Sequence, residues 1–402
     1  MRRAGGDLVS FDMGNSACQE CRPLSEPRAN TAVSSSPSFL PKIGPKGRLD
    51  YPELDGTRFC AFLAVFVFHG TQSLRKPGNP LSDLCSAASF GLPLFFLLSS
   101  YLITQVLLLE SSLTGRVALK AFYVRRVLRI WPLYLSFLTT NFIAGYFFHS
   151  LHIEPARFAA FLLLAGNWYV GAFGFGTNVI YPLWSISVEE QFYLLWPALA
   201  GKTVRVLGYS SVALTFVSLA TIYVLHQSGH TPDAIWTNSI ADFLFFAVGS
   251  LLAIRERAIT IKKTTRLGFT LIVLGFASWW PIERVCHLKS GETSSSLLFM
   301  VGYLLVTTSC CLIVYGFRSL PTHLFPGWVR YPGKISYGMY VFHKLALHES
   351  IHITRHSTSL FANLTASLVL TAILATASYR WLEKPFLRLK RGFEVIDTSR
   401  SV

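Results

Sequence analysis

Residues 89–109 read SFGLPLFFLLSSYLITQVLLL, an apolar run that contains no charged side chain. At about 1.5 Å per residue, a helix of this length reaches across the roughly 30 Å of hydrocarbon in a lipid bilayer. The run therefore predicts a membrane-spanning helix. Similar runs recur from Leu54 to the C-terminus, so the prediction extends to most of the chain.

Composition favours a membrane protein over a soluble one. The chain has 402 residues, of which 51% are hydrophobic and 14% are charged. An ordinary soluble domain carries roughly 25% charged residues, and its core cannot absorb this much apolar surface. The formal net charge of +15 would suit nucleic acid or a membrane surface, so the position of the charges decides between them.

The fold is predicted to be all-α, with about ten transmembrane helices. Each predicted span is an apolar run of roughly 17 to 25 residues or slightly fewer. The runs cover residues 54–70, 89–109, 130–148, 184–200, 206–225, 239–254, 267–282, 297–317, 335–352 and 360–379. An eleventh run, residues 158–172, contains the polar Asn167 and leads into the glycine-rich GAFGFG, which predicts a re-entrant or interfacial segment.

Lys and Arg gather in alternate connecting segments, which gives the expected orientation. With the N-terminus inside, they concentrate in residues 1–53, 110–129, 255–266 and 380–402. Cytoplasmic loops of membrane proteins carry this excess. If residues 158–172 also crossed, the later basic loops would face outward, so we predict that both termini are cytoplasmic. Charge that is spread over short loops also argues against a nucleic-acid partner.

The two ends of the chain are expected to lie outside the folded domain. Residues 1–46 are rich in Ser, Pro and Arg and lack the apolar core of a signal peptide, which predicts a disordered cytosolic tail. The transmembrane domain is expected to cover residues 47–391, followed by a cytosolic tail at residues 392–402.

Cys18 and Cys21 form one CxxC without a second pair, and no HExxH occurs, so no metal site is predicted.

The first predicted span, LDGTRFCAFLAVFVFHG, carries ionisable side chains inside an apolar helix. Such residues are energetically costly in a membrane and are functional candidates. Arg58 and His69 lie about 20° from a common helix face and roughly 16 Å apart along the axis. His69 alone could be an interfacial residue, but the aligned arginine favours function. We expect Arg58 near the cytoplasmic end and His69 near the outer end.

The segment LWSISVEEQFYLLWP places Glu189 and Glu190 near the outer start of the fourth span, at about the depth of His69. A carboxylate there could orient the imidazole or hold a hydroxylated acceptor. Adjacent helical residues point about 100° apart, so one of the two is expected to face the interior. The other interpretation is an interfacial pair that faces water.

A basic cluster marks the inner end of the third span. The segment FYVRRVLRIWPLY contains Arg125, Arg126 and Arg129, the last two on one helix face. Guanidinium groups suit bidentate recognition of phosphate. Basic residues at inner helix ends also follow from topology alone, so both interpretations stay open.

His343 lies inside the ninth span, in the segment KISYGMYVFH. Burying an ionisable ring without a partner is unfavourable in a membrane. A functional role and a hydrogen-bonded packing histidine are therefore both open.

These segments occur in an order that resembles the acyltransferase 3 family of integral-membrane O-acyltransferases, over about residues 50 to 391. LDGTRFCAFLAVFVFH resembles its opening arginine and histidine motif, and GLPLFFLLSSYLIT its second-helix signature. Four later segments are similar to later landmarks: FYVRRVLRIWPLY, PLWSISVEEQFYLLWP, ISYGMYVFH and YRWLEKPFLR. Phe59 and Ser100 depart from positions that are usually small, which changes packing and removes no chemical group.

The resemblance implies an enzyme that moves an acyl group, expected to be acetyl, from acyl-CoA to a hydroxyl of a carbohydrate or lipid-linked glycan acceptor. It implies a ten-helix domain, a donor reached from the cytoplasm, and functional roles for His69, Arg58, Arg126, Arg129 and Glu189. No bound cofactor is expected, and the expected location is a bacterial cytoplasmic membrane.

The candidate residues can be given roles in such a reaction. The arginine cluster of the third span would hold the phosphates of acyl-CoA, with the pantetheine arm running outward past Arg58. His69 would act as general base on the acceptor hydroxyl or accept the acyl group transiently, while Glu189 positions either partner. The alternative class is a non-enzymatic transporter or lipid flippase with a proton-relay histidine.

Overall fold

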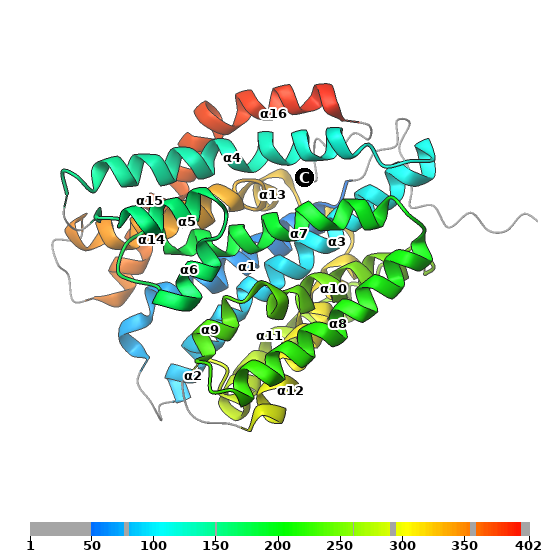
Figure 1. The fold of residues 1–402 in the computed structure, drawn as a ribbon, viewed down its shortest axis with the longest axis horizontal. Coiled ribbons are helices and arrows are strands. Elements are labelled where there is room, and N and C mark those ends of the chain that lie inside the picture. The colour runs from blue at the N-terminus through cyan, green and yellow to red at the C-terminus, as the bar shows by residue number, and fades with distance from the viewer. Residues whose placement is uncertain are drawn as a thin grey trace, which may run out of the picture. The chain divides into compact units, whose positions relative to one another are not determined.

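The structure is a computed structural model, and it describes residues 50–75, 80–148, 151–259, 261–289, 295–353 and 359–394. Every regular element in these ranges is helical, which confirms the all-α prediction (Figure 1). The predicted tail at residues 1–46 and most of the predicted tail at 392–402 lie outside the described residues.

Each predicted span coincides with one long helix. These helices are α1 (Pro52–Gly70), α3 (Gly91–Thr114), α4 (Leu119–Ala144), α7 (Trp184–Ala200), α8 (Val204–Gln227), α10 (Ser239–Glu256), α11 (Thr265–Cys286), α12 (Ser296–Ser319), α14 (Ser336–Ile353) and α15 (Leu360–Ser378). The largest difference is at α4, because the basic residues that precede its apolar run are helical as well.

Shorter elements connect the long helices. The short α-helices are α2 (Pro80–Ala87), α5 (Pro155–Leu162), α6 (Gly166–Phe173), α9 (Pro232–Trp236), α13 (Gly327–Lys334) and α16 (Lys384–Lys390). The 3₁₀ turns are η1 (Gln72–Leu74), η2 (Ala88–Phe90), η4 (Tyr181–Leu183), η5 (Thr322–Leu324) and η7 (Arg391–Phe393). A π-helical turn, η6 (Tyr379–Glu383), joins α15 directly to α16.

Among the residues that the structure describes, six helical stretches are long and apolar enough to cross a membrane, which supports a multi-pass membrane protein. They are Leu81–Thr114, Leu119–Ala144, Val204–Gln227, Thr265–Cys286, Ser296–Ser319 and Leu360–Phe393. The remaining long helices, α1, α7, α10 and α14, are shorter or carry more polar side chains, such as Arg58 and Lys344. Helices α1, α7 and α14 carry residues of the candidate site, and these polar residues make the three helices less apolar. The count of ten spans stays a prediction.

The run at residues 158–172 is broken into α5 and α6. Leu164, between the two helices, has a positive φ of 57°, which a helix cannot continue through. Each helix has 8 residues and is therefore about 12 Å long, too short to cross the hydrocarbon alone. This break is expected of a segment that does not cross as one helix.

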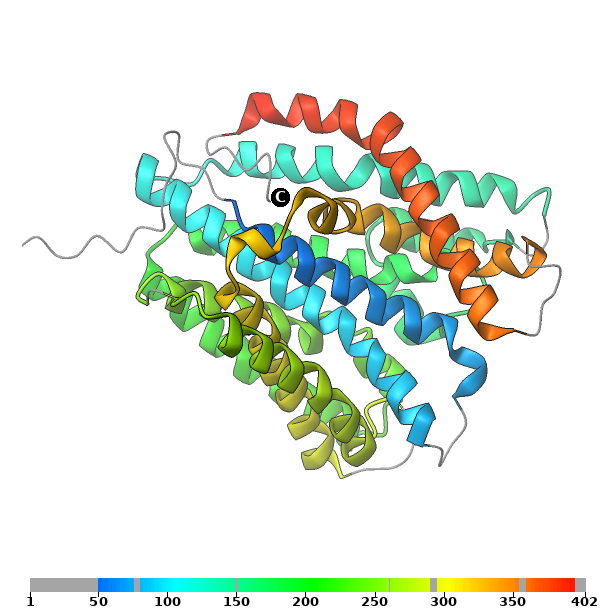
Figure 2. The ribbon, with the colours of Figure 1, turned by 180° about the vertical axis from the view of Figure 1, so that it is seen from behind.

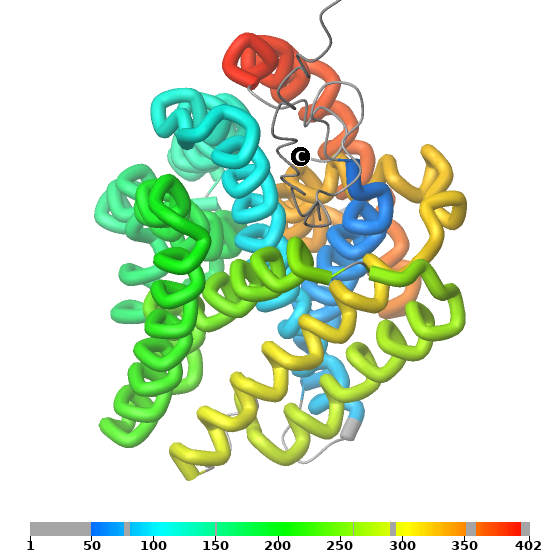
Figure 3. The backbone as a smooth tube through the Cα atoms, turned by 90° about the vertical axis from the view of Figure 1, so that its right-hand side faces the viewer, coloured from blue at the N-terminus to red at the C-terminus, as the bar shows by residue number. Residues whose placement is uncertain are grey.

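Helix α1 is packed against several other helices. It contacts α3, α12, α13 and α14, and Figure 2 shows it beside α3. Further pairs are α10 against α3 and α8, α14 against α15, and α16 against α4. Helices α11 and α12 also pack together, and Figure 3 shows this pair from another side. Charged residues on α1 can therefore be buried in protein and kept from lipid.

Small residues bring α3 and α10 close together. Ser100 is fully buried, and a Cβ atom on Gly249 would overlap its Oγ and the carbonyl oxygen of Leu97. Across the same interface Thr104 donates to the Oγ of Ser250 at 3.0 Å. Close approach of this kind is typical of membrane helix pairs. The serine that departs from the family pattern is thus accommodated by the absent side chain at Gly249.

Ion pairs show which helix ends lie on the same side of the helical domain. At the start of α1, Arg318 at the end of α12 pairs with Glu53 and with Glu256 at the end of α10. Helix α11 ends on the opposite side, where Arg284 pairs with Asp83 of α2 at 2.9 Å. Helices α10 and α12 therefore end where α1 begins, as the predicted order of spans requires.

Candidate active site

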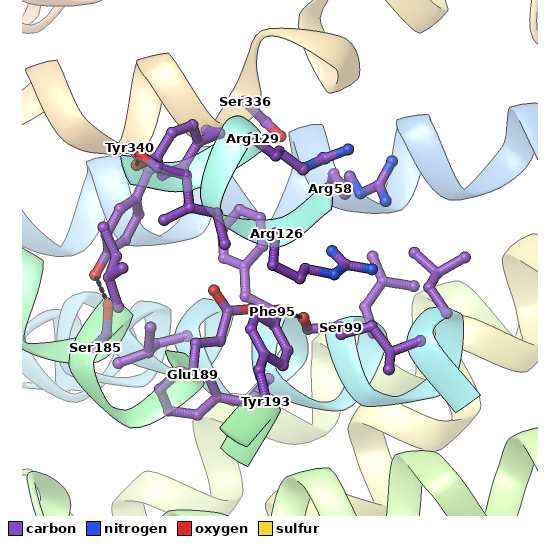
Figure 4. Close-up of a pocket in the computed structure, with 18 residues that line it drawn as sticks. Arg58, Phe95, Ser99, Arg126, Arg129, Ser185, Glu189, Tyr193, Ser336 and Tyr340 are labelled. Carbon is purple, nitrogen blue, oxygen red and sulfur yellow. Dashed lines mark hydrogen bonds between the residues drawn. The ribbon is translucent and has the colours of Figure 1, made fainter. Parts of the chain in front are cut away.

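The first of three neighbouring cavities, the central cavity, lies among α1, α3, α4, α7 and α14. Its polar lining residues are Arg58, Ser99, Arg126, Arg129, Ser185, Glu189, Tyr193, Ser336, Tyr337 and Tyr340. Figure 4 shows the guanidinium groups of Arg58, Arg126 and Arg129 on one side, and the hydrogen bond between Ser185 and Tyr340 on the other. The structure therefore brings together arginines from two helices that are far apart in the sequence.

Neighbouring groups hold these arginines in place. Arg58 donates to Oδ1 of Asp55 at 3.2 Å, and Asp55 is itself buried. The Cζ of Arg126 lies 5.2 Å from the centroid of the Tyr193 ring, a cation–π arrangement. Arg129 follows Arg126 by three residues on α4, so the two side chains extend toward the same cavity.

Arg125 points in a different direction from its two neighbours on α4. Its buried guanidinium pairs with Oε2 of Glu110 at 2.9 Å and donates to the carbonyl oxygen of Phe393 at 2.8 Å. It lines none of the three cavities. The structure thus separates Arg125 from Arg126 and Arg129, although the sequence groups them as one cluster.

The second cavity, the basic cavity, shares Arg58, Arg129 and Tyr337 with the central cavity. Its lining residues are Asp55, Arg58, Arg129, Lys334, Tyr337, Tyr379, Glu383, Lys384, Leu387, Arg388, Lys390, Arg391 and Glu394. Lys and Arg outnumber the carboxylates in this set, so the cavity favours an anionic ligand. Most of these cations come from the chain between α13 and η7 and were not candidates from the sequence.

The third cavity, the histidine cavity, lies at the other end of α1. Its lining residues are Val65, Phe68, His69, Gln72, Arg75, Ser89, Leu92, Phe175, Gly176, Thr177, Tyr181, Pro182, Trp184, Asp233, Trp236, Lys289, Tyr340 and Lys344. It shares Leu92 and Tyr340 with the central cavity. The three cavities therefore form a row along α1, with Arg58 and His69 roughly 16 Å apart on the helix axis.

His69 is hydrogen-bonded to a second histidine. Nε2 of His343 lies 2.9 Å from Nδ1 of His69, and Nδ1 of His343 lies 2.5 Å from the carbonyl oxygen of Tyr340. His343 is fully buried, whereas His69 lines the histidine cavity. The ring of Tyr181 also packs against His69, with 5.6 Å between the ring centroids. The position of the His69 ring is therefore fixed from two sides.

This pairing assigns the hydrogens of the two neutral rings. A carbonyl oxygen can only accept, so Nδ1 of His343 carries a hydrogen and its Nε2 accepts from Nδ1 of His69. Nε2 of His69 is then the nitrogen without a hydrogen. An unprotonated imidazole nitrogen beside a cavity can take a proton or attack a carbonyl carbon.

The two adjacent carboxylates of α7 are placed apart from His69. Glu189 lines the central cavity with the arginines, and the hydrogen-bond partner of His69 is His343 instead. Glu190 accepts from Nε1 of Trp131 at 3.0 Å and lines none of the three cavities. Within the described ranges, no group of three or more His, Cys, Asp and Glu residues is placed to hold a metal ion.

Cations also line the histidine cavity. The ammonium of Lys344 lies 5.2 Å from the centroid of the Tyr181 ring. The guanidinium carbon of Arg75 lies 4.0 Å from the centroid of the Phe68 ring. Lys289 pairs with Asp233 at 2.5 Å. Burial lowers the pKa of the Arg75 guanidinium and raises the pKa of the Tyr181 hydroxyl. The positive charge at this end of α1 was not predicted from the sequence.

Several cavity residues were not among the candidates from the sequence. Ser185 and Tyr340 share a hydrogen bond of 2.7 Å, and Tyr340 borders two cavities. Ser185 precedes Glu189 by four residues and Tyr340 precedes His343 by three, so helical periodicity places each beside a candidate that was named. That periodicity is a signal that could have found them. No such signal marks Arg75, which follows α1 in a turn.

Comparison with known proteins gives the class of this fold and site. A family model described as an acyltransferase domain (Acyl_transf_3) matches residues 51–380. The match includes α1, the arginines of α4, and the two histidines. The chain belongs to the acyltransferase 3 family, which confirms the resemblance.

Three bacterial relatives show how far the similarity extends. The protein OatA of Listeria monocytogenes, named a peptidoglycan O-acetyltransferase, is 24% identical over 379 residues, covering 85% of this chain and 57% of that protein. OatA of Staphylococcus aureus, named an O-acetyltransferase, is 23% identical over 364 residues, covering 85% and 58%. YrhL of Bacillus subtilis is 25% identical over 357 residues, covering 83% and 54%. The chain thus spans little more than half the length of these relatives. No solved structure matches it significantly.

Proposed function

We propose that this chain is a membrane O-acyltransferase that moves an acyl group, in the simplest case acetyl, from acyl-CoA to a hydroxyl of a carbohydrate or lipid-linked glycan. The observation that carries the proposal is the row of cavities along α1, with arginines at one end and Nε2 of His69 at the other. Membership of the acyltransferase 3 family and the names of the OatA relatives support this type of reaction.

The basic cavity suits the phosphorylated end of acyl-CoA. Cations such as Lys334 and Arg388 line it, and Arg58 and Arg129 continue the positive charge into the central cavity. Guanidinium groups bind phosphate oxygens in pairs, which favours Arg129 together with Arg126 as donor-binding residues. Arg125 is not assigned to the donor, because its guanidinium is already paired with Glu110 and lines none of the cavities.

The reacting groups meet at the other end of the row. Nε2 of His69 takes the proton of the acceptor hydroxyl, and the hydroxyl oxygen attacks the thioester carbonyl carbon. The carbon–sulfur bond breaks, and the imidazolium returns its proton to the thiolate of CoA. A transient acyl group on the same nitrogen is the covalent route to the same products. In both routes His343 orients His69, while Glu189 lies where it can position the donor arm.

The proposed topology has ten spanning helices and both termini in the bacterial cytoplasm. Six stretches of the described chain meet the length and composition of a span, and the ion pairs at the helix ends are consistent with the order of spans. An excess of Lys and Arg is typical of the cytoplasmic side, which favours that side for the basic cavity. The donor would then enter from inside, and the acceptor would reach His69 from outside.

Transfer of label tests the proposal directly. Membranes that contain the full chain are incubated with radiolabelled acetyl-CoA and a glycan acceptor, and the glycan is then recovered. The expected result is label in an alkali-labile ester, and its absence with the His69→Ala variant. A transporter or flippase would leave acetyl-CoA intact and the glycan unlabelled, and that outcome would contradict the proposal.

A further inference from the structure

We infer that the histidine cavity binds an acceptor with a negative charge, such as a sugar that carries a carboxylate or a phosphate. This inference rests on the proposed function, and it specifies the class of acceptor. The observations that carry it are the cations, the unpaired hydrogen-bond donors and the aromatic rings that line this one cavity.

Positive charge in the histidine cavity exceeds the negative charge that faces it. Arg75, Lys289 and Lys344 line the cavity, and Asp233 is the one carboxylate among its lining residues. Asp233 is already paired with Lys289. Within the described part of the chain, Arg75 and Lys344 have no ion pair and are both partly buried. Cations withdrawn from water require a counter-charge, which an anionic ligand would supply.

Two donors in the same wall lack acceptors. Nε of Arg75 and Oγ of Ser89 are buried, and neither has a hydrogen-bond partner among the described residues. Ser89 is 4% exposed and lines the cavity. Buried polar groups are nearly always hydrogen-bonded, so a site with unpaired donors favours a ligand rich in acceptor oxygens. Carboxylate, phosphate and sugar hydroxyl oxygens all provide such acceptors.

The cavity also has the surfaces and the space for a sugar ring. The rings of Phe175 and Tyr181 are 5.5 Å apart between centroids, and Trp184 and Trp236 complete the aromatic wall. The cavity has a volume of about 420 Å³, within the roughly 300–1,000 Å³ of typical ligand sites. A sugar bound there would present a hydroxyl to His69, which belongs to the same wall.

The inference is tested by binding of a matched pair of probes. The full chain is placed in nanodiscs of zwitterionic lipid, so that no anionic headgroup competes. Isothermal titration calorimetry then compares a disaccharide of N-acetylglucosamine and N-acetylmuramic acid with its methyl ester, which lacks the charge. We expect the acid to bind at least about tenfold more tightly than the ester, since one ion pair of about 1.4 kcal/mol corresponds to that factor. A sugar phosphate as competitor shows whether phosphate is accepted as well.

Variants of the cavity residues test which side chains cause the preference for the acid over the ester. Arg75→Gln and Lys344→Gln should each remove most of the difference between acid and ester, whereas Lys344→Arg keeps the charge and should retain it. Lys202→Gln is the control, because Lys202 is exposed and lies in none of the cavities. Equal affinity for acid and ester, or no binding of the acid, would overturn the inference.

Acetyl transfer in the same nanodiscs separates this inference from the proposed function. Efficient transfer to a neutral glycan and to the ester would leave the proposed function standing and overturn the anionic acceptor. Tight, charge-dependent binding of the acid without any consumption of acetyl-CoA would support the anionic site and contradict the acyltransferase.

Discussion

Nε2 of His343 lies 2.9 Å from Nδ1 of His69, although 274 residues separate them in the sequence. His343 is itself fixed by the carbonyl oxygen of Tyr340 at 2.5 Å. The hydrogen positions in this chain of three groups leave Nε2 of His69 unprotonated. The reactivity of His69 and the orienting role of His343 can therefore be tested separately.

The first prediction concerns the reactive nitrogen of His69. His69→Ala and His69→Gln should both lose detectable acetyl transfer, because general base catalysis contributes about 10²- to 10⁴-fold and glutamine cannot relay a proton. Transfer of radiolabel is measured at equal protein abundance in the membrane. A glutamine variant within about threefold of wild type, a difference below 1 kcal/mol, would remove His69 from the mechanism.

The second prediction concerns His343 as a positioning residue. His343→Phe keeps an aromatic ring but removes the imidazole nitrogen that accepts from Nδ1–H of His69, so kcat should fall about tenfold or more while the KM for acetyl-CoA is unchanged. His343→Gln retains an acceptor oxygen and should recover part of kcat. If His343 serves packing alone, phenylalanine should be tolerated better than glutamine, and that order of activities would refute the orienting role.

The third prediction tests the close approach of α3 and α10. Gly249→Ala places a Cβ atom against backbone of Leu97, which cannot move aside as a side chain can. We expect a loss of about 1–3 kcal/mol in stability, seen as a lower Tm of the purified protein. Gly208→Ala is the control, since nothing lies within 4 Å of a Cβ at that position. Equal Tm values for the two variants would contradict the proposed packing constraint.

The helices could be predicted because long apolar runs have one stable arrangement in a bilayer. The polar Asn167 also indicated that residues 158–172 do not cross as one helix, because it interrupts the apolar run, and the structure has a break at Leu164. Charged residues within predicted spans, such as Arg58 and His69, were visible as candidates for the same reason. A membrane penalises each of them unless protein surrounds it.

The contacts between spans could not be predicted in the same way. Which residue orients His69 depends on the rotation of α14 against α1, and no local pattern in the sequence fixes that rotation. The direction of Arg125 likewise depends on Glu110 in a different helix. Helical geometry alone separates Arg125 from Arg126 by about 100°, but it does not say which of them faces a cavity.

The fourth prediction concerns topology. Residue 228 follows α8 and residue 262 lies between α10 and α11, and we expect them on opposite sides of the membrane. In a variant without native cysteines, Ser228→Cys should react with a membrane-impermeant thiol reagent in intact cells. Lys262→Cys should react only after the cells are opened, because its segment is rich in Lys and Arg. Labelling of position 262 in intact cells would invalidate the orientation.

The fifth prediction separates donor binding from stability among the arginines of α4. Arg126→Ala and Arg129→Ala should each raise the KM for acetyl-CoA about tenfold or more, since hydrogen bonds to charged groups contribute about 1.5–3 kcal/mol. Lysine at either position should rescue poorly, because an ammonium lacks the planar fork of the guanidinium. If both alanine variants kept a normal KM, we would assign the pair to topology alone.

Unlike Arg126→Ala and Arg129→Ala, Arg125→Ala should lower the stability of the protein and leave the KM for acetyl-CoA unchanged. It leaves the carboxylate of Glu110 buried without its cation, and breaking a buried ion pair costs about 3–5 kcal/mol. We therefore expect a lower Tm with an unchanged KM for acetyl-CoA in the protein that remains folded. The double variant Arg125→Met with Glu110→Gln removes both charges and keeps an acceptor for the backbone N–H of Ala118, so stability should return. A raised KM in this stable double variant would instead place Arg125 among the residues that bind the donor.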